Sequence, residues 1–452
     1  MDQRDKTGFP RAILHVDGDS FFVSCELTRR PGLRGRAVVT GEERGIATAL
    51  NPAAKSLGVV RGMRTSEIRR SFPQVVILPS DYRMYAQYAR RMYAIVRRYT
   101  DLVEEYSIDE CFADVTEAAR KGGTAAVEAV AATIQTDLYV ELGITFSVGV
   151  SVNKVCAKVA SKWVKPFGLT VIPREAIPDF LVGLPIGKVW GIGSATTVKL
   201  RKLGIATALD LARKDRAWVA EHCDKPLAEI YEEFQGNLVK ELETGVGATV
   251  PLGGGSRRMP GSLQRTRTFY PAVGVDPRGR DFVWSQLSYH VEDACARLRG
   301  QGLVASRVGF FMKTQAFEYI RGEAFLPDAS AAPDEVLRAI EPEFERLWKR
   351  LEGGAGSSGG ARVGRHISFR ASGISLGGLK SADDSAQALF DVPARHAGSR
   401  LIQSAIDRIA RKFGKHSVFL GSSFRAMKHA GDFDEPTGKD RFWDVIYMGE
   451  VV

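Results

Sequence analysis

Two short acidic motifs could carry out chemistry. The first is HVDGDSFF at residues 15–22, in which Asp17 directly follows an apolar stretch. The second is YSIDECF at residues 106–112, in which Asp109 and Glu110 are adjacent within an apolar, β-like run. Carboxylates in apolar strands are costly to bury unless they are paired or bind a metal ion. One such acid could simply cap a strand at the surface, but two clusters indicate a metal site.

Carboxylate oxygens are hard ligands, and they suit Mg²⁺, which binds few protein carboxylates and keeps several waters. Two such ions, about 3.5–4 Å apart, can stabilise both the attacking and the leaving oxygen of a phosphoryl transfer. The two motifs therefore predict two-metal chemistry with Mg²⁺, and Mn²⁺ is a second ion that the same oxygens could hold.

The elements around these motifs are mixed. Residues 12–16 (AILHV) predict a short buried strand that Asp17 ends, and residues 144–150 (ITFSVGV) alternate as a second strand does. Residues 82–99 have apolar side chains at helical spacing. This mixture predicts an α+β layer with helices packed on a sheet.

The later part of the chain changes character twice. From Pro173 to about Gly245 the pattern is helical, and a Gly-, Ser- and Pro-rich stretch that reads as a linker follows. Residues 306–313 and 366–370 then alternate as strands with one apolar and one basic face, and helices are expected near 284–298 and 334–350.

Composition excludes several classes of protein. The 452 residues are 44% hydrophobic and 26% charged, as in ordinary globular proteins, and carry a net charge of +10. The five cysteines are scattered without a CxxC pair, so neither a zinc site nor a disulfide framework is expected. There is no apolar run long enough for a membrane span and no leader-like N-terminus, so we expect a cytoplasmic protein.

Several segments together resemble the Y-family DNA polymerases. HVDGDSFF, SIDECF and SVGVSVNKVCAKVASKWVKPFG are similar to the palm motifs of that family, and LPIGKVWGIGSATTVKLRKLGI is similar to its thumb segment. The likeness continues through SLQRTRTF and QALFD…AIDRIARKFG, so it covers nearly the whole chain in the family's order.

The resemblance implies an α+β multidomain fold shaped like a right hand. This fold has a palm of mixed sheet and helices, small fingers, a helical thumb with a helix-hairpin-helix motif, and an α/β little finger. The expected boundaries are the palm at 1–20 and 82–172, the fingers at 21–81, the thumb at 173–245, a linker at 246–260, the little finger at 261–380 and a C-terminal segment at 381–452.

By the same resemblance, Asp17, Asp109 and Glu110 are the expected catalytic and metal-binding residues, together with the backbone carbonyl of Gly18. Family members usually have a bulky residue at this position, but glycine should not harm metal binding because only the carbonyl is used. Asp19 also matches a family acid, and we interpret it as a structural acid rather than a ligand.

Phe22 matches the family's steric gate, a flat ring under the sugar that leaves no room for a 2′-hydroxyl. Phe21 is also a nucleotide-binding candidate, although a core role suits it better. Lys165 matches the lysine that contacts the incoming triphosphate, where an ammonium offsets phosphate charge. The alternative for Lys165 is a solvated lysine before a turn.

The expected finger segment departs from the family. Pro52 stands where the family has tyrosine and Lys55 where it has arginine. Lysine keeps the charge but loses the bidentate fork. The nucleotide grip is therefore expected to be looser, or to use other groups such as Thr48.

DNA contacts are expected in two places. Gly191 and Gly193 allow a tight hairpin whose backbone N–H groups can bind a phosphate without reading sequence. Residues 251–320 carry ten Lys or Arg against five Asp or Glu, half the net charge of the chain, so the little finger is expected to track DNA. Its candidate contacts are Arg265, Arg267, Arg307, Lys313 and Arg370.

Lys154, Lys158 and Lys162 form an i, i+4 stripe, and such stripes are usually solvated helix faces. The segment SAQALFD at 385–391 resembles sliding-clamp-binding peptides, with Leu389 and Phe390 as anchors. Its glutamine is one residue too close to this pair, so a segment docked on its own domain is the alternative.

The resemblance implies a monomer that uses primer-template DNA and a dNTP and that performs low-fidelity translesion synthesis. No exonuclease motif is evident, so proofreading is not expected. A non-catalytic relative that binds DNA or recruits partners is the alternative, but such relatives have lost the carboxylates. A metal-dependent nuclease is disfavoured by the steric-gate and thumb motifs.

Overall fold

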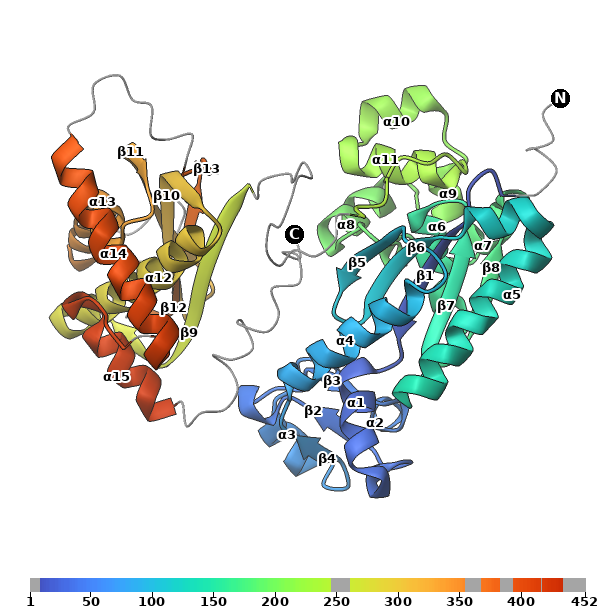
Figure 1. Cartoon of the computed structure of the whole chain (residues 1–452), viewed down its shortest axis with the longest axis horizontal. Coiled ribbons are helices and arrows are strands. Elements are labelled where there is room, and N and C mark those ends of the chain that lie inside the picture. Colours follow the sequence, from blue (N-terminus) through green and yellow to red (C-terminus); the bar gives the residue numbers. More distant parts are fainter. Residues whose placement is uncertain (1–8, 245–260, 354–366, 383–392, 416, 434–452) are drawn as a thin grey trace. The chain divides into compact units, whose positions relative to one another are not determined.

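The structure is a computed structural model that describes residues 9–244, 261–353, 367–382, 393–415 and 417–433. The described residues form two compact units that divide near residue 253 (Figure 1). Each unit has a hydrophobic core of its own. The expected linker at 246–260 lies outside the described residues.

A five-stranded sheet forms the centre of the first unit. In spatial order its strands are β5 (Val103–Ser107), β6 (Glu110–Asp114), β1 (Ile13–Gly18), β7 (Phe146–Ser151) and β8 (Leu169–Ile172). Neighbouring strands are antiparallel, except that β7 and β8 are parallel. The strand predicted at residues 12–16 is confirmed as β1, which is central and buried along its whole length.

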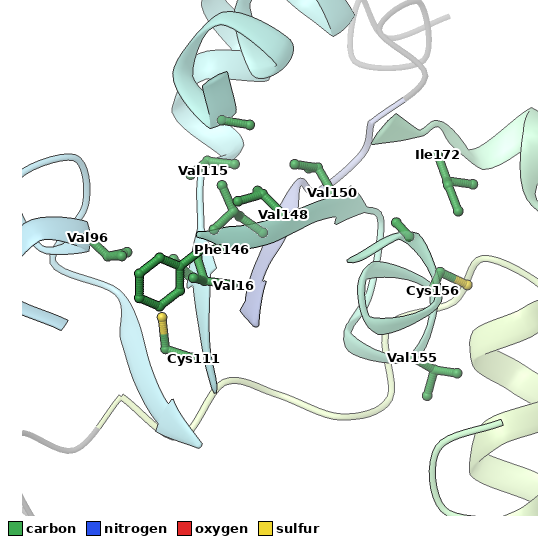
Figure 2. Packing of buried hydrophobic residues seen from close by; sticks show 14 of the residues in the cluster. Val16, Val96, Cys111, Val115, Phe146, Val148, Val150, Val155, Cys156 and Ile172 are labelled. Atoms are coloured by element: carbon green, nitrogen blue, oxygen red, sulfur yellow. The ribbon is translucent and has the colours of Figure 1, made fainter. Parts of the chain in front are cut away.

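Helices cover both faces of this sheet. They are α4 (Tyr82–Val96), α5 (Thr116–Leu142) and α6 (Lys154–Trp163). On one face Val16 and Cys111 lie beside Phe146 and Val96 of α4 (Figure 2). On the other face Ile13 packs with Ala157 of α6. Since side chains alternate along a strand, β1 contributes to two cores at once.

A small subdomain is inserted between β1 and α4. It begins with α1 (Phe21–Arg29) and contains a three-stranded sheet with α2 (Pro52–Ser56) and α3 (Thr65–Ser71). The order of its strands is β3 (Ala49–Leu50), β2 (Val38–Thr40) and β4 (Val76–Leu78). Val39, Ala47 and Ile68 belong to a separate small core here.

The last part of the first unit is helical, as predicted. Its helices are α7 (Ile177–Leu181), α8 (Ser194–Lys202), α9 (Ala208–Ala212), α10 (Arg216–His222) and α11 (Lys225–Phe234). Thr207, Asp215 and Asp224 start α9, α10 and α11, because each side chain accepts a hydrogen bond from a first-turn backbone N–H.

The second unit contains an antiparallel sheet with helices. The order of its strands is β11 (Tyr319–Ser330), β10 (Leu303–Thr314), β12 (Ser368–Gly377) and β9 (Ser262–Gly274), and β13 (Lys380–Ser381) pairs with β10. Its helices are α12 (Pro277–Gly300), α13 (Pro333–Glu352), α14 (Pro393–Phe413) and α15 (Phe424–Phe433).

One face of this second sheet is covered, and the side chains of residues 307–313 that lie on the other face are half-buried or exposed. Val308, Phe310 and Met312 are buried in a core shared with α12 and α13. Arg307 and Lys313 alternate with them and therefore lie on the opposite face, which we call the open face. The predicted alternation of residues 306–313 is confirmed.

Candidate active site

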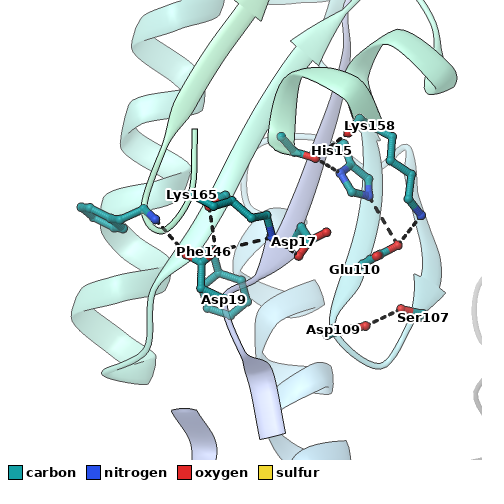
Figure 3. Close-up of polar contacts among 12 residues, drawn as sticks. His15, Asp17, Asp19, Ser107, Asp109, Glu110, Phe146, Lys158 and Lys165 are labelled. Carbon is teal, nitrogen blue, oxygen red and sulfur yellow. Dashed lines mark hydrogen bonds and ion pairs between the residues drawn. The ribbon is translucent and has the colours of Figure 1, made fainter. Parts of the chain in front are cut away.

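The three predicted catalytic carboxylates lie at one end of the five-stranded sheet (Figure 3). Asp17 in β1 is the register partner of Glu110 in β6. Asp109 occupies the turn between β5 and β6, and its carbonyl oxygen accepts a 2.9 Å hydrogen bond from the backbone N–H of Gly18. Antiparallel pairing of β1 and β6 thus brings together two motifs that are far apart in the sequence.

The two neighbouring acids in the turn have different environments. Burial, together with the negative charges of Glu110 and Asp17, raises the pKa of Asp109, although a 2.6 Å hydrogen bond from Ser107 opposes this effect. Burial would also raise the pKa of Glu110, but interactions with His15 and Lys158 outweigh it and lower this pKa. Glu110 is therefore held as a carboxylate.

Lys158 and His15 are site residues that the sequence did not identify. Lys158 Nζ lies 2.6 Å from Glu110 Oε2. His15 is fully buried, with Nε2 3.6 Å from the same oxygen and Nδ1 2.7 Å from Ser161 Oγ of α6. Burial lowers the pKa of His15 against the opposing effect of Glu110. The available signal was the alternation of His15 with Asp17, which puts both side chains on the face that α6 covers.

The expectation that Lys154, Lys158 and Lys162 form a solvated helix face was wrong for two of the three. Lys154 and Lys158 are buried, whereas Lys162 is exposed. Lys154 Nζ lies 2.7 Å from both carboxylate oxygens of Glu104. The reason is that α6 turns this face toward the sheet, where each buried ammonium has a carboxylate partner.

Lys165 also lies in the site. Its Nζ is 2.5 Å from Asp17 Oδ1 and 3.5 Å from Asp19 Oδ1. Burial alone would lower the pKa of Lys165, but these carboxylates outweigh it and raise the pKa. Asp19 also accepts hydrogen bonds of 2.8 Å from Ser147 Oγ and from the backbone N–H of Phe167. These contacts fit the structural role expected for Asp19.

The oxygen donors suit divalent cations in their chemistry, since Asp17, Asp109 and Glu110 offer carboxylates and Gly18 offers a carbonyl. Within the described part of the chain, no group of three or more His, Cys, Asp or Glu side chains is gathered around one point. Instead, the ammonium of Lys165 lies against Asp17, and that of Lys158 forms an ion pair with Glu110. Burial is the main cause of the raised pKa of Asp109, and the negative charges of Glu110 and Asp17 add to it. A divalent cation would offset these charges.

The adjacent phenylalanines lie in different surroundings. Phe21 is only 3% exposed and packs with Phe146, so its side chain is part of the core. Phe22 is half-buried and stacks on Tyr85, with ring centroids 4.5 Å apart, and it meets the Tyr82 ring edge-on. This arrangement fixes the Phe22 ring while leaving part of it accessible.

The finger residues have local structural roles. Pro52 is the first residue of α2, a position where its missing N–H costs nothing, and Asn51 caps the helix by accepting from Ala54 N at 3.0 Å. Thr48 Oγ1 lies 3.0 Å from Thr40 Oγ1, and Lys55 is exposed on α2.

The two thumb glycines differ in backbone conformation and in the space around them. Gly191 has φ +88°, and a Cβ there would lie 3.0 Å from Ile230 Cδ1, so the position requires glycine. Gly193 is the extended residue that precedes α8, and a Cβ there would meet open space. Both glycines lie in the short connection between a 3₁₀ turn at Ile186–Lys188 and α8.

The predicted DNA contacts in the second unit lie on both faces of its sheet. Arg307 and Lys313 are on the open face, and the guanidinium of Arg370 lies 4.6 Å from the ring centroid of Phe317. Arg265 and Arg267 instead face α12, where Arg265 forms an ion pair with Asp293 and Arg267 lies over the Tyr289 ring. The expectation that these two arginines contact DNA is therefore not retained, because β9 turns them toward the covered face.

Two further expectations concern other parts of the chain. Leu389 and Phe390 of the expected clamp-binding peptide lie outside the described residues. Among the residues that the structure describes, no helix is both long and apolar enough to cross a membrane.

Three models of one family match the chain. Residues 16–162 match the impB/mucB/samB family, residues 174–205 match the IMS family HHH motif, and residues 260–389 match the C-terminal domain of the impB/mucB/samB family. The first match contains the three carboxylates, and the second contains Gly191 and Gly193.

Individual proteins are similar over most of their length. DNA polymerase IV of Neisseria meningitidis serogroup C is 37% identical over 76% of this chain and 96% of its own. DNA polymerase IV of Desulfatibacillum aliphaticivorans is 30% identical over 90% of this chain and 95% of its own. A solved Y-family DNA polymerase chimera, 21% identical, matches 81% of this chain and 99% of its own with a TM-score of 0.64, which supports the same fold. This chain therefore belongs to the impB/mucB/samB family, as a Y-family DNA polymerase of the DNA polymerase IV type.

Proposed function

We propose that this protein is a template-directed DNA polymerase that transfers a deoxynucleotide from its triphosphate to a primer 3′-hydroxyl and releases pyrophosphate. The observation that carries the proposal is the position of Asp17, Asp109 and Glu110 at the same end of the sheet, with Lys165 beside Asp17. A non-catalytic DNA-binding relative would not need all three carboxylates.

Two Mg²⁺ ions per active site are the proposed cofactors, with Mn²⁺ as an alternative. Asp17, Asp109, Glu110 and the carbonyl of Gly18 would hold them. When bound, such ions favour loss of the 3′-hydroxyl proton and stabilise the charge of the leaving pyrophosphate. His15 and Lys158 keep Glu110 ionised and oriented.

The protein's own residues would bind the nucleotide. Lys165, which lies against Asp17, can turn its ammonium to the triphosphate. We assign Phe22 as the steric gate because its ring is fixed by Tyr85 and yet partly accessible. Thr48 and Lys55 remain proposed nucleotide contacts from the fingers, and Phe21 would act from the core beneath the gate.

The proposed DNA contacts are the thumb hairpin at Gly191 and Gly193 and the open face with Arg307, Lys313 and Arg370. The proposed domains are the palm at 1–20 and 82–172, the fingers at 21–81, the thumb at 173–245, the linker at 246–260, the little finger at 261–380 and the C-terminal segment at 381–452. We further propose that the protein is a cytoplasmic monomer and that it binds a sliding clamp through Leu389 and Phe390.

The proposed activity is low-fidelity translesion synthesis without proofreading, as expected for this family. Primer extension on an undamaged template and on one with a lesion tests it, with Mg²⁺, with Mn²⁺ and with a chelator. Extension by single nucleotides that requires a divalent cation is the expected result. DNA binding without extension under every condition would favour the non-catalytic alternative, and degradation of the primer would favour a nuclease.

A further inference from the structure

Exposed aromatic side chains lie on and beside the open face of the second sheet. Phe317, in the turn between β10 and β11, is 60% exposed, and Tyr319 at the start of β11 is 46% exposed. Tyr319 lies edge-on to the Phe311 ring, with centroids 5.3 Å apart. Large rings gathered at the surface of a soluble protein usually mark a binding site.

The backbone of Phe317 makes its exposure more informative. Its φ angle is +67°, in the left-handed region that glycine and asparagine adopt easily and that a bulky residue rarely adopts. Glycine would relax this turn, and the exposed ring adds little to the core. A backbone outlier of this kind indicates a functional reason for the side chain.

Cations surround these rings. Lys313 Nζ lies 4.8 Å from the ring centroid of Phe317 and 4.7 Å from that of Tyr319. The guanidinium of Arg370 lies 4.6 Å from the Phe317 centroid, and that of Arg321 lies 5.1 Å from the Tyr319 centroid. We call these five residues the aromatic–cation ladder.

Alternating rings and cations match the chemistry of single-stranded nucleic acid. Unpaired bases can stack on aromatic rings while lysine and arginine contact the phosphates. A duplex hides the faces of its bases and offers mainly phosphates to a basic surface, so exposed rings would add little to its binding. An acidic protein segment would use the cations but has no need of flat rings.

We propose that the aromatic–cation ladder binds unpaired nucleotides of the template strand, with at least one base stacked on Phe317. This proposal rests on the proposed function, because a primer-template offers a single-stranded 5′ overhang next to a duplex. It adds a stacking site to the electrostatic contacts of the open face.

The test compares the affinity of the full chain for two primer-templates that differ only in the length of the template overhang. One has an overhang of about one nucleotide and the other of about eight thymines. Wild type should bind the long overhang more tightly. Phe317→Ala should lose roughly 5- to 150-fold in affinity for the long overhang, the range measured for one stacked base, and little for the short one.

Two variants control this comparison. Phe325 is 73% exposed on the same open face, where its register partner is Arg307. Phe325→Ala therefore removes an exposed ring away from the ladder and should change neither affinity. Phe317→Trp keeps a ring and should keep the affinity for the long overhang. Thermal melting of each variant establishes that it is folded.

A fluorescent base analogue in the overhang gives an independent readout, because stacking should quench its emission in wild type and not in Phe317→Ala. The proposal is overturned if Phe317→Ala binds both DNAs as wild type does, weakens both equally, or matches Phe325→Ala. Nucleotide addition on the short overhang is measured in parallel. If wild type adds no nucleotide, the proposed polymerase function is refuted. The stacking proposal is tested by the binding comparison alone.

Discussion

The buried ion pair between Lys154 and Glu104 allows a quantitative test of how α6 is anchored to the sheet. The two side chains are only 7% and 8% exposed, and Lys154 Nζ also lies 4.9 Å from the ring centroid of Phe112. Lys154→Met keeps a long, unbranched side chain beside this ring but removes the charge. Glu104 is then left buried without its cation, which should cost about 3–5 kcal/mol of unfolding free energy.

For a unit of this size, each kcal/mol lowers the melting temperature by about 2–4 °C, so a loss of roughly 6–20 °C is expected. Calorimetry or circular dichroism measures it. Lys162→Met changes an exposed lysine of the same helix and should cost less than about 1 kcal/mol. Glu104→Gln in the Lys154→Met background should recover much of the loss. If Lys154→Met costs no more than Lys162→Met, or Glu104→Gln recovers nothing, the pair does not anchor the helix.

Three further predictions concern the proposed reaction. Asp109→Ala should abolish nucleotide addition but leave primer-template affinity nearly unchanged, because affinity comes mainly from phosphate contacts; near-wild-type extension would show that the site is misassigned. Phe22→Ala should raise ribonucleotide insertion by orders of magnitude, whereas Phe21→Ala should cost about 3–5 kcal/mol of stability without this gain. Insertion assays and thermal melts measure both effects, and a gain of ribonucleotide insertion in Phe21→Ala instead of Phe22→Ala would contradict the assignment. Replacing Arg307 and Lys313 by alanine should weaken binding to all sequences and flatten the salt dependence by a slope of roughly one per lost phosphate contact, and an unchanged slope would show that they do not face DNA.

The elements that the sequence predicted well are those with a local signal. The central strand β1 was recognisable from the run AILHV before Asp17, in which four of five residues are apolar, and α4 from apolar residues at helical spacing. In β10, alternation identified Val308, Phe310 and Met312 as the core face. Periodicity is set by the geometry of a single element, so it can be read from one segment without knowledge of the rest.

The wrong predictions concern side chains whose burial depends on which other element covers their face of a helix or strand. The spacing of Lys154 and Lys158 shows that they share one side of α6, but it does not show that this side meets Glu104 and Glu110 of the sheet. Arg265 shows the same limit, because alternation along β9 gives two faces without saying which of them α12 covers. Partners distant in the sequence decide both cases.

The departure from the family at residue 18 also has an explanation in packing. A Cβ on Gly18 would lie 2.7 Å from Cδ2 of Phe21, so the ring of Phe21 occupies the space that a side chain at residue 18 would need. Phe21 is itself held in the core against Phe146, and so it cannot move away at little cost. The glycine is therefore a packing requirement. Because the metal-binding role assigned to residue 18 uses only its carbonyl, this packing can change the side chain there without changing the proposed chemistry.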